Sequence, residues 1–255
     1  MLDGQRLVEL DGPAAHDIVG VDEVPMTLGG LARHNVANAL AAAGGARAMG
    51  ATREQVADGL RDFRPTADLS PGRLNLFRLG AWTVIVDFAH NEAGTSAILD
   101  VARGLAERAG AGADAVTAII GTAGDRPDDT LRGIGRIAAA AAGRPVIKET
   151  LAYLRGRERQ DIVRLLCDGL TEGGVDPDDV PVYGSESEAL DAELAGQGAL
   201  AAGTAGDQPR VVVLFCHEER DEVFALLHRL GAVPAELGTQ ASPQASPQAA
   251  APTTA

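Results

Sequence analysis

The stretch that decides the fold is Trp82-Thr83-Val84-Ile85-Val86-Asp87-Phe88-Ala89-His90-Asn91, an apolar run that ends in polar residues. β-Branched and aromatic side chains fill its first half, which predicts a buried strand. A second β run, 74–77, precedes it across a tight turn near Gly80, and an amphipathic helical pattern covers 93–108. This part of the chain therefore predicts strands followed by a helix, with polar groups at the end of a strand.

The same alternation of strand and helix repeats toward the C-terminus. Further strands are expected at 116–120, 145–148, 180–183 and 211–215, and further helices at 130–142, 158–171, 186–195 and 219–230. Alternating elements of this length predict an α/β fold, a Rossmann-like and mostly parallel sheet with helices on both faces. In such a sheet ligands bind beyond the carboxyl ends of the strands, so the residues after each strand are the candidates for a site.

The segments outside this alternation differ in character. The first 25 residues are strand-like, and two helices are predicted between Leu31 and Phe63, the first interrupted near its end by Gly44-Gly45. Thr52 with Gln55 predicts a capping box for the second helix. We therefore predict a partial domain at 1–66, the α/β domain at 67–233, and a disordered tail rich in Ala, Ser, Pro and Gln at 234–255.

The composition restricts the function classes. The chain has 255 residues, 22 Lys and Arg against 36 Asp and Glu, and a net charge of −14. An acidic surface disfavours nucleic acids and anionic membranes as partners. The start of the chain lacks a signal-peptide pattern, no apolar run reaches the ~20 residues that span a bilayer, and two distant cysteines form no motif. These features predict a cytoplasmic protein.

Lys148 is the only lysine in the sequence. A phosphate loop needs Gly-Lys-Ser/Thr, whereas Lys148 lies in Val-Ile-Lys-Glu-Thr, so these 255 residues contain no such loop. No His or Cys spacing typical of a metal site occurs either, and we expect no independent metal site.

Polar residues after three of the predicted strands, and on one predicted helix, could carry chemistry. Asp87, His90 and Asn91 could contact a nucleotide, although Asp87 and Asn91 could equally cap the next helix. Gly121 to Arg126 resembles a glycine loop, with a simple strand-to-helix turn as the alternative. Arg155 and Arg157 could hold an acidic group through their guanidinium forks, or could be solvated at the surface. Asn35 and Asn38 share one face of a predicted helix, where they could contact a base or cap the helix.

Taken in order, these pieces resemble the Mur ligase family. The resemblance rests on Pro25-Met26-Thr27-Leu28-Gly29-Gly30, His34 to Ala42, Pro71-Gly72-Arg73, Val86 to Asn91, Gly121-x-x-Gly124-Asp125-Arg126 and Leu154-Arg155-Gly156-Arg157. Within the family it points to the cyanophycin synthetase branch, and it covers the chain from about Val24 to about Gly231. The wording around Arg155 and Arg157 differs from that of related ligases, so the substrate is the weakest part of the resemblance.

The resemblance implies an ATP-dependent amide ligase that works through an acyl phosphate, with ATP and Mg²⁺ as cofactors and an amino acid or peptide-like substrate. Carboxylate is a poor electrophile, and phosphorylation gives it a leaving group. The implied ATP contacts are Asn35, Asn38, Arg73, Asp87, His90 and Asn91, and the implied substrate contacts are Arg126, Arg155 and Arg157.

The missing phosphate loop leaves three hypotheses. The first is that the chain is the C-terminal portion of a ligase, inactive without an N-terminal ATPase half. The second is a non-catalytic module that binds nucleotide or amino acid. The third is an oligomerisation subunit that uses the face left by the missing domain.

Overall fold

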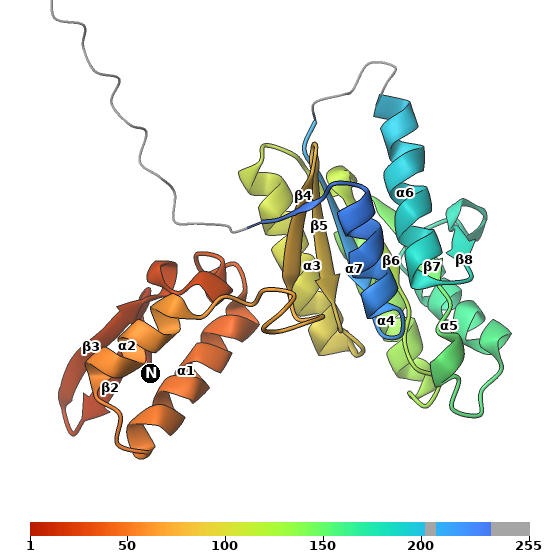
Figure 1. The fold of residues 1–255 in the computed structure, drawn as a ribbon. Coiled ribbons are helices and arrows are strands. Elements are labelled where there is room, and N and C mark those ends of the chain that lie inside the picture. Colours follow the sequence, from red (N-terminus) through yellow and green to blue (C-terminus); the bar gives the residue numbers. More distant parts are fainter. Residues whose placement is uncertain (202–207, 236–255) are drawn as a thin grey trace, which may run out of the picture.

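The computed structural model describes residues 1–201 and 208–235, with the backbone alone for 197–201 (Figure 1). The chain is paired to the main sheet as far as strand β10 (Val233–Pro234), which lies beside strand β4 (Asn75–Leu79). The remainder of the predicted tail, 236–255, lies outside the described residues. None of the described helices is long and apolar enough to cross a membrane.

The N-terminal part contains a small antiparallel sheet and two helices. Its strands are β1 (Leu2–Asp3), β2 (Arg6–Asp11) and β3 (Ala14–Gly20), and its helices are α1 (Arg33–Ala48) and α2 (Arg53–Asp62). Apolar side chains of both helices pack on the sheet. The Thr52–Gln55 capping box is confirmed, with Gln55 N–H donating to Thr52 Oγ1 over 3.1 Å.

The predicted interruption of the first helix is wrong, because α1 runs through Gly44 and Gly45 to Ala48. Each interior glycine costs a helix about 1 kcal/mol relative to alanine. Tertiary contacts offset that cost. Ala43 is buried in the core, and Arg47 in the last turn pairs with Glu9 of β2, Nε to Oε1, over 2.9 Å.

The main sheet has seven strands in the order β10-β4-β5-β9-β6-β7-β8. β4 and β10 are antiparallel to their neighbours, and the other pairs are parallel. The sheet includes β5 (Trp82–Asp87), β6 (Val116–Ile120), β7 (Arg144–Lys148), β8 (Val182–Tyr183) and β9 (Arg210–Phe215). The strand expected at 180–183 is therefore shorter than predicted.

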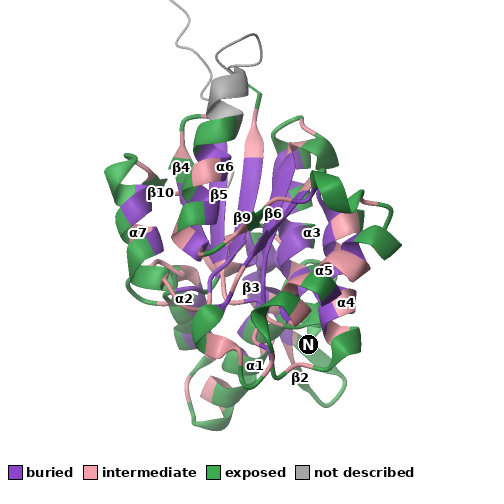
Figure 2. Cartoon of the chain, turned by 90° about the vertical axis from the view of Figure 1, so that its right-hand side faces the viewer, coloured by how far each residue is buried: buried purple, intermediate pink, exposed green. Residues whose placement is uncertain are grey.

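Helices cover both faces of this sheet (Figure 2). One face packs on α3 (Glu92–Arg108), α4 (Asp128–Ala141) and α5 (Arg159–Glu172), and the other on α6 (Glu186–Ala201) and α7 (Arg220–Arg229). Successive side chains of β9 point to opposite faces of the sheet, so Val213 packs against the first layer of helices and Val212 against the second. Both faces are therefore apolar, which is why helices cover both. The predicted α/β fold, mostly parallel with helices on both faces, is confirmed.

The N-terminal part also contacts the main sheet's helical layer. Leu28 and Ala32 are buried in the same cluster as residues of α3. Arg108 of α3 donates to the backbone carbonyls of Leu28 (2.8 Å) and Gly29 (3.2 Å). The boundary predicted at residue 66 falls in the segment between α2 and β4, and stays a prediction.

Candidate functional site

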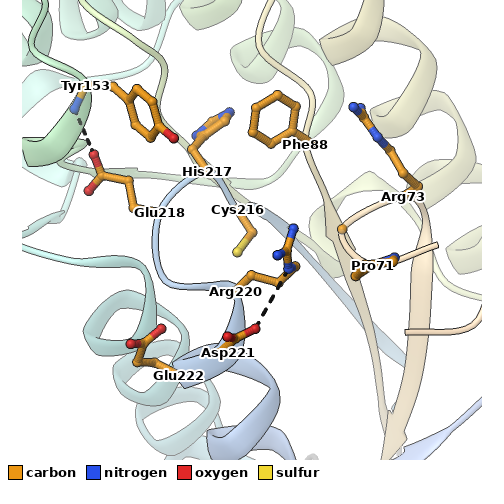
Figure 3. A pocket seen from close by; sticks show the side chains of 11 residues that line it. Pro71, Arg73, Phe88, Tyr153, Cys216, His217, Glu218, Arg220, Asp221 and Glu222 are labelled. Atoms are coloured by element: carbon orange, nitrogen blue, oxygen red, sulfur yellow. Dashed lines mark hydrogen bonds and ion pairs between the residues drawn. The ribbon is translucent and has the colours of Figure 1, made fainter. Parts of the chain in front are cut away.

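Two cavities lie at the carboxyl edge of the parallel strands. The larger, of about 490 Å³, is shown in Figure 3, and the smaller has about 140 Å³. Phe88, Tyr153 and His217 line both, so these three side chains form a common floor. The loops after β5, β7 and β9 supply them, as the fold rule for parallel sheets predicts.

Arg73 lines the larger cavity from the loop before β4. Its guanidinium lies 4.9 Å from the centre of the Phe88 ring. The turn that presents it is strained, because Leu74 has φ +50°, and Asp87 Oδ2 accepts the Leu74 N–H over 2.8 Å. Burial raises the pKa of Asp87, while that hydrogen bond and the charge of Arg73 oppose the rise. Asp87 therefore does not cap α3, but holds the turn that carries Arg73.

The other two polar residues after β5 have separate roles. Asn91 is the N-cap of α3, and its Oδ1 accepts the Gly94 N–H over 2.8 Å, so the capping alternative is confirmed for Asn91. His90 lines the smaller cavity and its Nδ1 donates to the Phe88 carbonyl over 2.9 Å. Of the three residues, only His90 lines either cavity.

Asn35 and Asn38 lie together on α1, as their spacing predicts. Asn38 Nδ2 donates to Asn35 Oδ1 over 3.1 Å, and Asn35 Nδ2 donates to the Met26 carbonyl over 2.8 Å. Asn35 is buried and Asn38 is exposed. Neither lines the two cavities. Their contact with a base stays a prediction, and Asn38 is the side chain free to make it.

The three candidate substrate arginines divide into two groups. Arg126 and Arg155 line the smaller cavity. Arg126 Nε is buried without a hydrogen-bond partner, and Arg155, at φ +52°, lies 5.1 Å from the centre of the Tyr153 ring. Arg157 instead donates to the Gly124 carbonyl (2.9 Å), the Arg126 carbonyl (3.1 Å) and the Asp128 carboxylate (2.7 Å). Its guanidinium joins two loops rather than facing a cavity.

The glycines of the Gly121-x-x-Gly124 loop are required by packing. A Cβ on Gly121 would lie 2.5 Å from Lys148 Cε, and a Cβ on Gly124 would lie 2.1 Å from the Leu154 carbonyl oxygen. The loop joins β6 to α4, and its residues Ala123, Asp125 and Arg126 line the smaller cavity. Arg126 is not simply solvated there, because its Nε is buried.

Sequence reasoning missed a buried polar cluster beneath the floor. Lys148 and Glu186 have side chains 0% and 1% exposed, with Nζ and Oε1 2.5 Å apart. Lys148 Nζ also lies 2.9 Å from His217 Nδ1. Burial and the Lys148 charge lower the pKa of His217 to about 3. Burial alone would raise the pKa of Glu186, but Lys148 and backbone N–H groups lower it.

Acidic residues complete the rim of the larger cavity. Glu218 accepts the backbone N–H groups of Ala152 (2.6 Å) and Tyr153 (3.1 Å), and burial raises its pKa. Asp221 and Glu222, in the first turn of α7, line the same cavity together with Arg220. The larger cavity therefore presents guanidinium groups on one side and carboxylates on the other (Figure 3).

Comparison with known proteins identifies relatives of this chain. The family model described as "Mur ligase, glutamate ligase domain" matches residues 72–214, more than half of the chain. Cyanophycin synthetase of Crocosphaera subtropica is 36% identical over 71% of this chain and 20% of that protein. UDP-N-acetylmuramyl-tripeptide synthetase of Deinococcus radiodurans is 36% identical over 60% of this chain and 28% of that protein.

Among solved structures, a murein peptide ligase of Psychrobacter arcticus is similar over 79% of this chain and 38% of that one, at 18% identity and a TM-score of 0.47. The chain spans only about a fifth of the cyanophycin synthetases that it matches. The family model, which matches residues 72–214 and so most of the main sheet, shows that this chain belongs to the Mur ligase family.

Proposed function

We propose that this chain forms the C-terminal side of the active site of an ATP-dependent carboxylate–amine ligase that takes an amino acid or a peptide-like substrate. The observation that carries the proposal is the placement of three guanidinium groups, from Arg73, Arg126 and Arg155, around one aromatic floor at the carboxyl edge of the sheet. Family membership supports the reaction class.

The smaller cavity suits the carboxylate of the amino acid. Arg126 Nε has an unused hydrogen-bond donor there, and Arg155 brings a second guanidinium to the same wall. Two planar forks can hold a carboxylate in a fixed orientation. Arg157 then acts through the loops, since it holds the Gly124 and Arg126 carbonyls in place.

The larger cavity suits the phosphates of ATP on the side of Arg73, which is exposed and held out over Phe88. ATP would supply the phosphoryl group that activates the carboxylate of the acceptor substrate. Asp87 fixes the Arg73 turn, and we propose that Asn38, His90 and Asn91 face the nucleotide. The described residues include no cluster of His, Cys, Asp or Glu that could hold Mg²⁺. We therefore assign the metal ligands to the ATPase part.

That ATPase part must supply the lysine of the phosphate loop. Lys148, the only lysine, is fully buried in an ion pair and cannot reach a phosphate. We infer that the activity needs sequence beyond these 255 residues, in a longer chain or in a partner, and that it takes place in the cytoplasm without nucleic acid.

Reconstitution tests the proposal. The chain is mixed with the part of the Crocosphaera subtropica protein that precedes the matched region, and ADP release is measured with a panel of amino acids. We expect ADP release that depends on both components and on one amino acid of the panel. Arg126→Gln should raise the KM for that amino acid at least tenfold, whereas the matched surface variant Arg136→Gln should not. No ADP release with any amino acid would contradict the proposal.

A second function, that of a non-catalytic binding module, is favoured by the same lysine count. It predicts micromolar binding of an amino acid or nucleotide to the isolated chain, measured by calorimetry, with no ADP release in any reconstitution. Reconstituted turnover would exclude it.

A further inference from the structure

The charged groups of Lys148 and Glu186 are buried next to the site but take no part in the function proposed above. Lys148 lies at the end of β7 and Glu186 at the start of α6. An ammonium has three donors, and all three are used: Glu186 Oε1 at 2.5 Å, His217 Nδ1 at 2.9 Å and Thr150 Oγ1 at 3.1 Å. The contact with His217 connects this pair to the floor of both cavities.

Glu186 holds the turn that follows β9. Its carboxylate accepts the backbone N–H groups of three successive residues, His217 (2.6 Å), Glu218 (3.2 Å) and Glu219 (2.9 Å), and the thiol of Cys216 (3.1 Å). Successive backbone N–H groups that converge in this way form an anion-binding concavity. Here the anion is a side chain of the protein, so the turn 216–219 is formed around Glu186.

Lys148 fixes the protonation of His217. Because an ammonium can only donate, His217 Nδ1 must accept, and the ring proton is on Nε2. Nε2 donates to the Ala89 carbonyl over 2.9 Å. The ring also meets Phe88 edge to face, with centres 5.1 Å apart. One imidazole thus joins the end of β7 to the loop after β5.

The same turn sets the position of Glu218 in the larger cavity. Its carboxylate accepts the N–H groups of Ala152 and Tyr153, so the turn after β9 is joined to the loop after β7. All three loops that supply the common floor therefore depend on Glu186 and Lys148, either directly or through His217 and Glu218.

A second ion pair, with a buried carboxylate and a partly exposed guanidinium, shows that joining these two elements does not require this arrangement. Arg144 and Glu193 join the same two elements, β7 and α6, with Nε and Oε2 2.5 Å apart and Glu193 1% exposed. The Glu193 carboxylate accepts hydrogen bonds from Arg144 and from the Tyr183 hydroxyl. Among the hydrogen bonds of the described residues, none joins Glu193 to the turn 216–219. The two pairs therefore differ in their other hydrogen bonds: Glu186 also accepts backbone N–H groups of the turn 216–219, and Glu193 does not.

We propose that Lys148 and Glu186 are positioning residues of the amino-acid site, which set the turn 216–219 and the Nε2–H form of His217 and so shape both cavities. This inference rests on the proposed function, because the ligand is the amino acid assigned there. Neither residue touches the ligand, and both act through His217 and Glu218.

The main test compares two neutral double variants of the full chain. Lys148→Met/Glu186→Gln removes both charges at the carboxyl edge, and Arg144→Met/Glu193→Gln does the same for the other pair. A glutamine has one carbonyl oxygen, so its NH₂ would face backbone donors that the carboxylate accepts. Calorimetry measures binding of glycine, L-lysine, L-arginine, L-aspartate and L-glutamate. We expect the tightest ligand to bind at least tenfold more weakly to the first variant and within twofold to the second.

A second readout needs no ligand. Nitrogen NMR of ¹⁵N-histidine-labelled chain reports which ring nitrogen of His217 carries the proton. Wild type and the Arg144 variant should show Nε2–H with the Nδ1 signal shifted by the hydrogen bond that it accepts. In Lys148→Met/Glu186→Gln the Nδ1 signal should move toward that of a free acceptor, since methionine cannot donate, while the Ala89 carbonyl keeps the proton on Nε2. Nδ1–H in the wild type would overturn the inference, as would equal binding by the two double variants.

A third variant guards against loss of folding. Glu186→Asp keeps the charge balance but shortens the side chain by one methylene, so it cannot reach all three N–H groups. We expect binding three- to tenfold weaker with the His217 form unchanged, and wild-type binding would contradict the role of the turn. If the wild type binds none of the five amino acids, the two double variants are compared by their KM in the reconstituted ligase. Absence of ADP release there contradicts the proposed function, and the NMR result still decides whether Lys148 sets His217.

Discussion

The two ends of the main sheet contain the same kind of interaction used in different ways. At the amino end of β7, Arg144 pairs with Glu193 of α6, and at the carboxyl end Lys148 pairs with Glu186 of the same helix. The Glu193 carboxylate accepts hydrogen bonds from side chains only, whereas the Glu186 carboxylate also accepts three backbone N–H groups of a turn. The first pair therefore joins two elements, and the second also shapes a loop.

This difference follows from the fold. In a parallel sheet the loops at the carboxyl end surround the ligand, while those at the amino end only reverse the chain. Loops have few apolar contacts to hold them, so a buried anion with several directed hydrogen bonds is an effective way to fix one. A buried pair adds little net stability compared with apolar packing, and we infer that its value here lies in geometry.

The largest expected effect is loss of one partner from the fully buried pair. Lys148→Met leaves Glu186 charged and without its cation, which should lower the free energy of unfolding by about 3–5 kcal/mol. Arg144→Met should cost less, roughly 1–3 kcal/mol, because the Arg144 side chain is 37% exposed and Tyr183 still donates to Glu193. Urea denaturation at pH 7 measures both, and equal losses would remove the distinction between the two ends.

Two glycines extend the comparison to the backbone. A Cβ on Gly124 would lie 2.1 Å from the Leu154 carbonyl oxygen, and one on Gly143, at the amino end, 2.5 Å from Asp114 Cα. Each substitution by alanine should cost about 1–3 kcal/mol, since backbone must move in both cases. Only Gly124→Ala should also weaken amino-acid binding, because it separates the loop of Arg126 from that of Arg155. Denaturation and calorimetry on both variants check this, and weaker binding by Gly143→Ala would contradict it.

Acid should weaken the carboxyl end in a defined pH range. The folded-state pKa of Glu186 is about 2 against an ordinary 4.5, and that of His217 is about 3 against 6.5. In both cases the unfolded chain takes up the proton first, so stability is complete above the ordinary pKa and is lost as pH falls toward the folded value. Each group contributes a slope of up to about 1.4 kcal/mol per pH unit.

The double variant Lys148→Met/Glu186→Gln isolates that contribution. Its free energy of unfolding should fall less steeply than that of the wild type between pH 4.5 and pH 3, because Glu186 no longer titrates and because His217 loses the Lys148 charge that lowers its pKa. Urea denaturation at half-unit pH intervals measures both curves. Parallel curves over this range would show that Glu186 is not the group responsible.

Much of the fold could be predicted because it depends on local patterns. The run Trp82–Val86 is apolar and β-branched, and the strand β5 follows it closely. The end of helix α1 was harder to predict. Two glycines favour an interruption there, but the ion pair between Arg47 and Glu9 stabilises the last turn of the helix. That partner is 38 residues away, and no local pattern reports it.

The site could be predicted only in part, for the same reason. Strand ends indicated the loops of His90, Arg126 and Arg155, and these three side chains line the smaller cavity, while their roles stay predictions. The partners of His217 are Glu186, 31 residues away, and Lys148, 69 residues away, so its spacing gave no signal. A lone lysine inside an apolar strand was the one available hint, because a buried charge requires a partner.

The smallest expected effects distinguish a cap from a ligand contact. Asn91 caps α3 after β5, at the carboxyl edge of the sheet, and Thr52 caps α2 in the N-terminal part. Substitution of either by alanine should lower the free energy of unfolding by about 1 kcal/mol, since each leaves a backbone N–H without its acceptor. Serine can also cap a helix, so Asn91→Ser should keep the stability.

If Asn91 also faces the nucleotide, as proposed, Asn91→Ser should raise the KM for ATP in the reconstituted ligase several-fold at unchanged stability, and Thr52→Ser should not. Thermal unfolding and the ADP assay on these two variants separate the roles. A wild-type KM for Asn91→Ser would leave Asn91 as a cap alone, equivalent to Thr52 despite its place at the carboxyl edge.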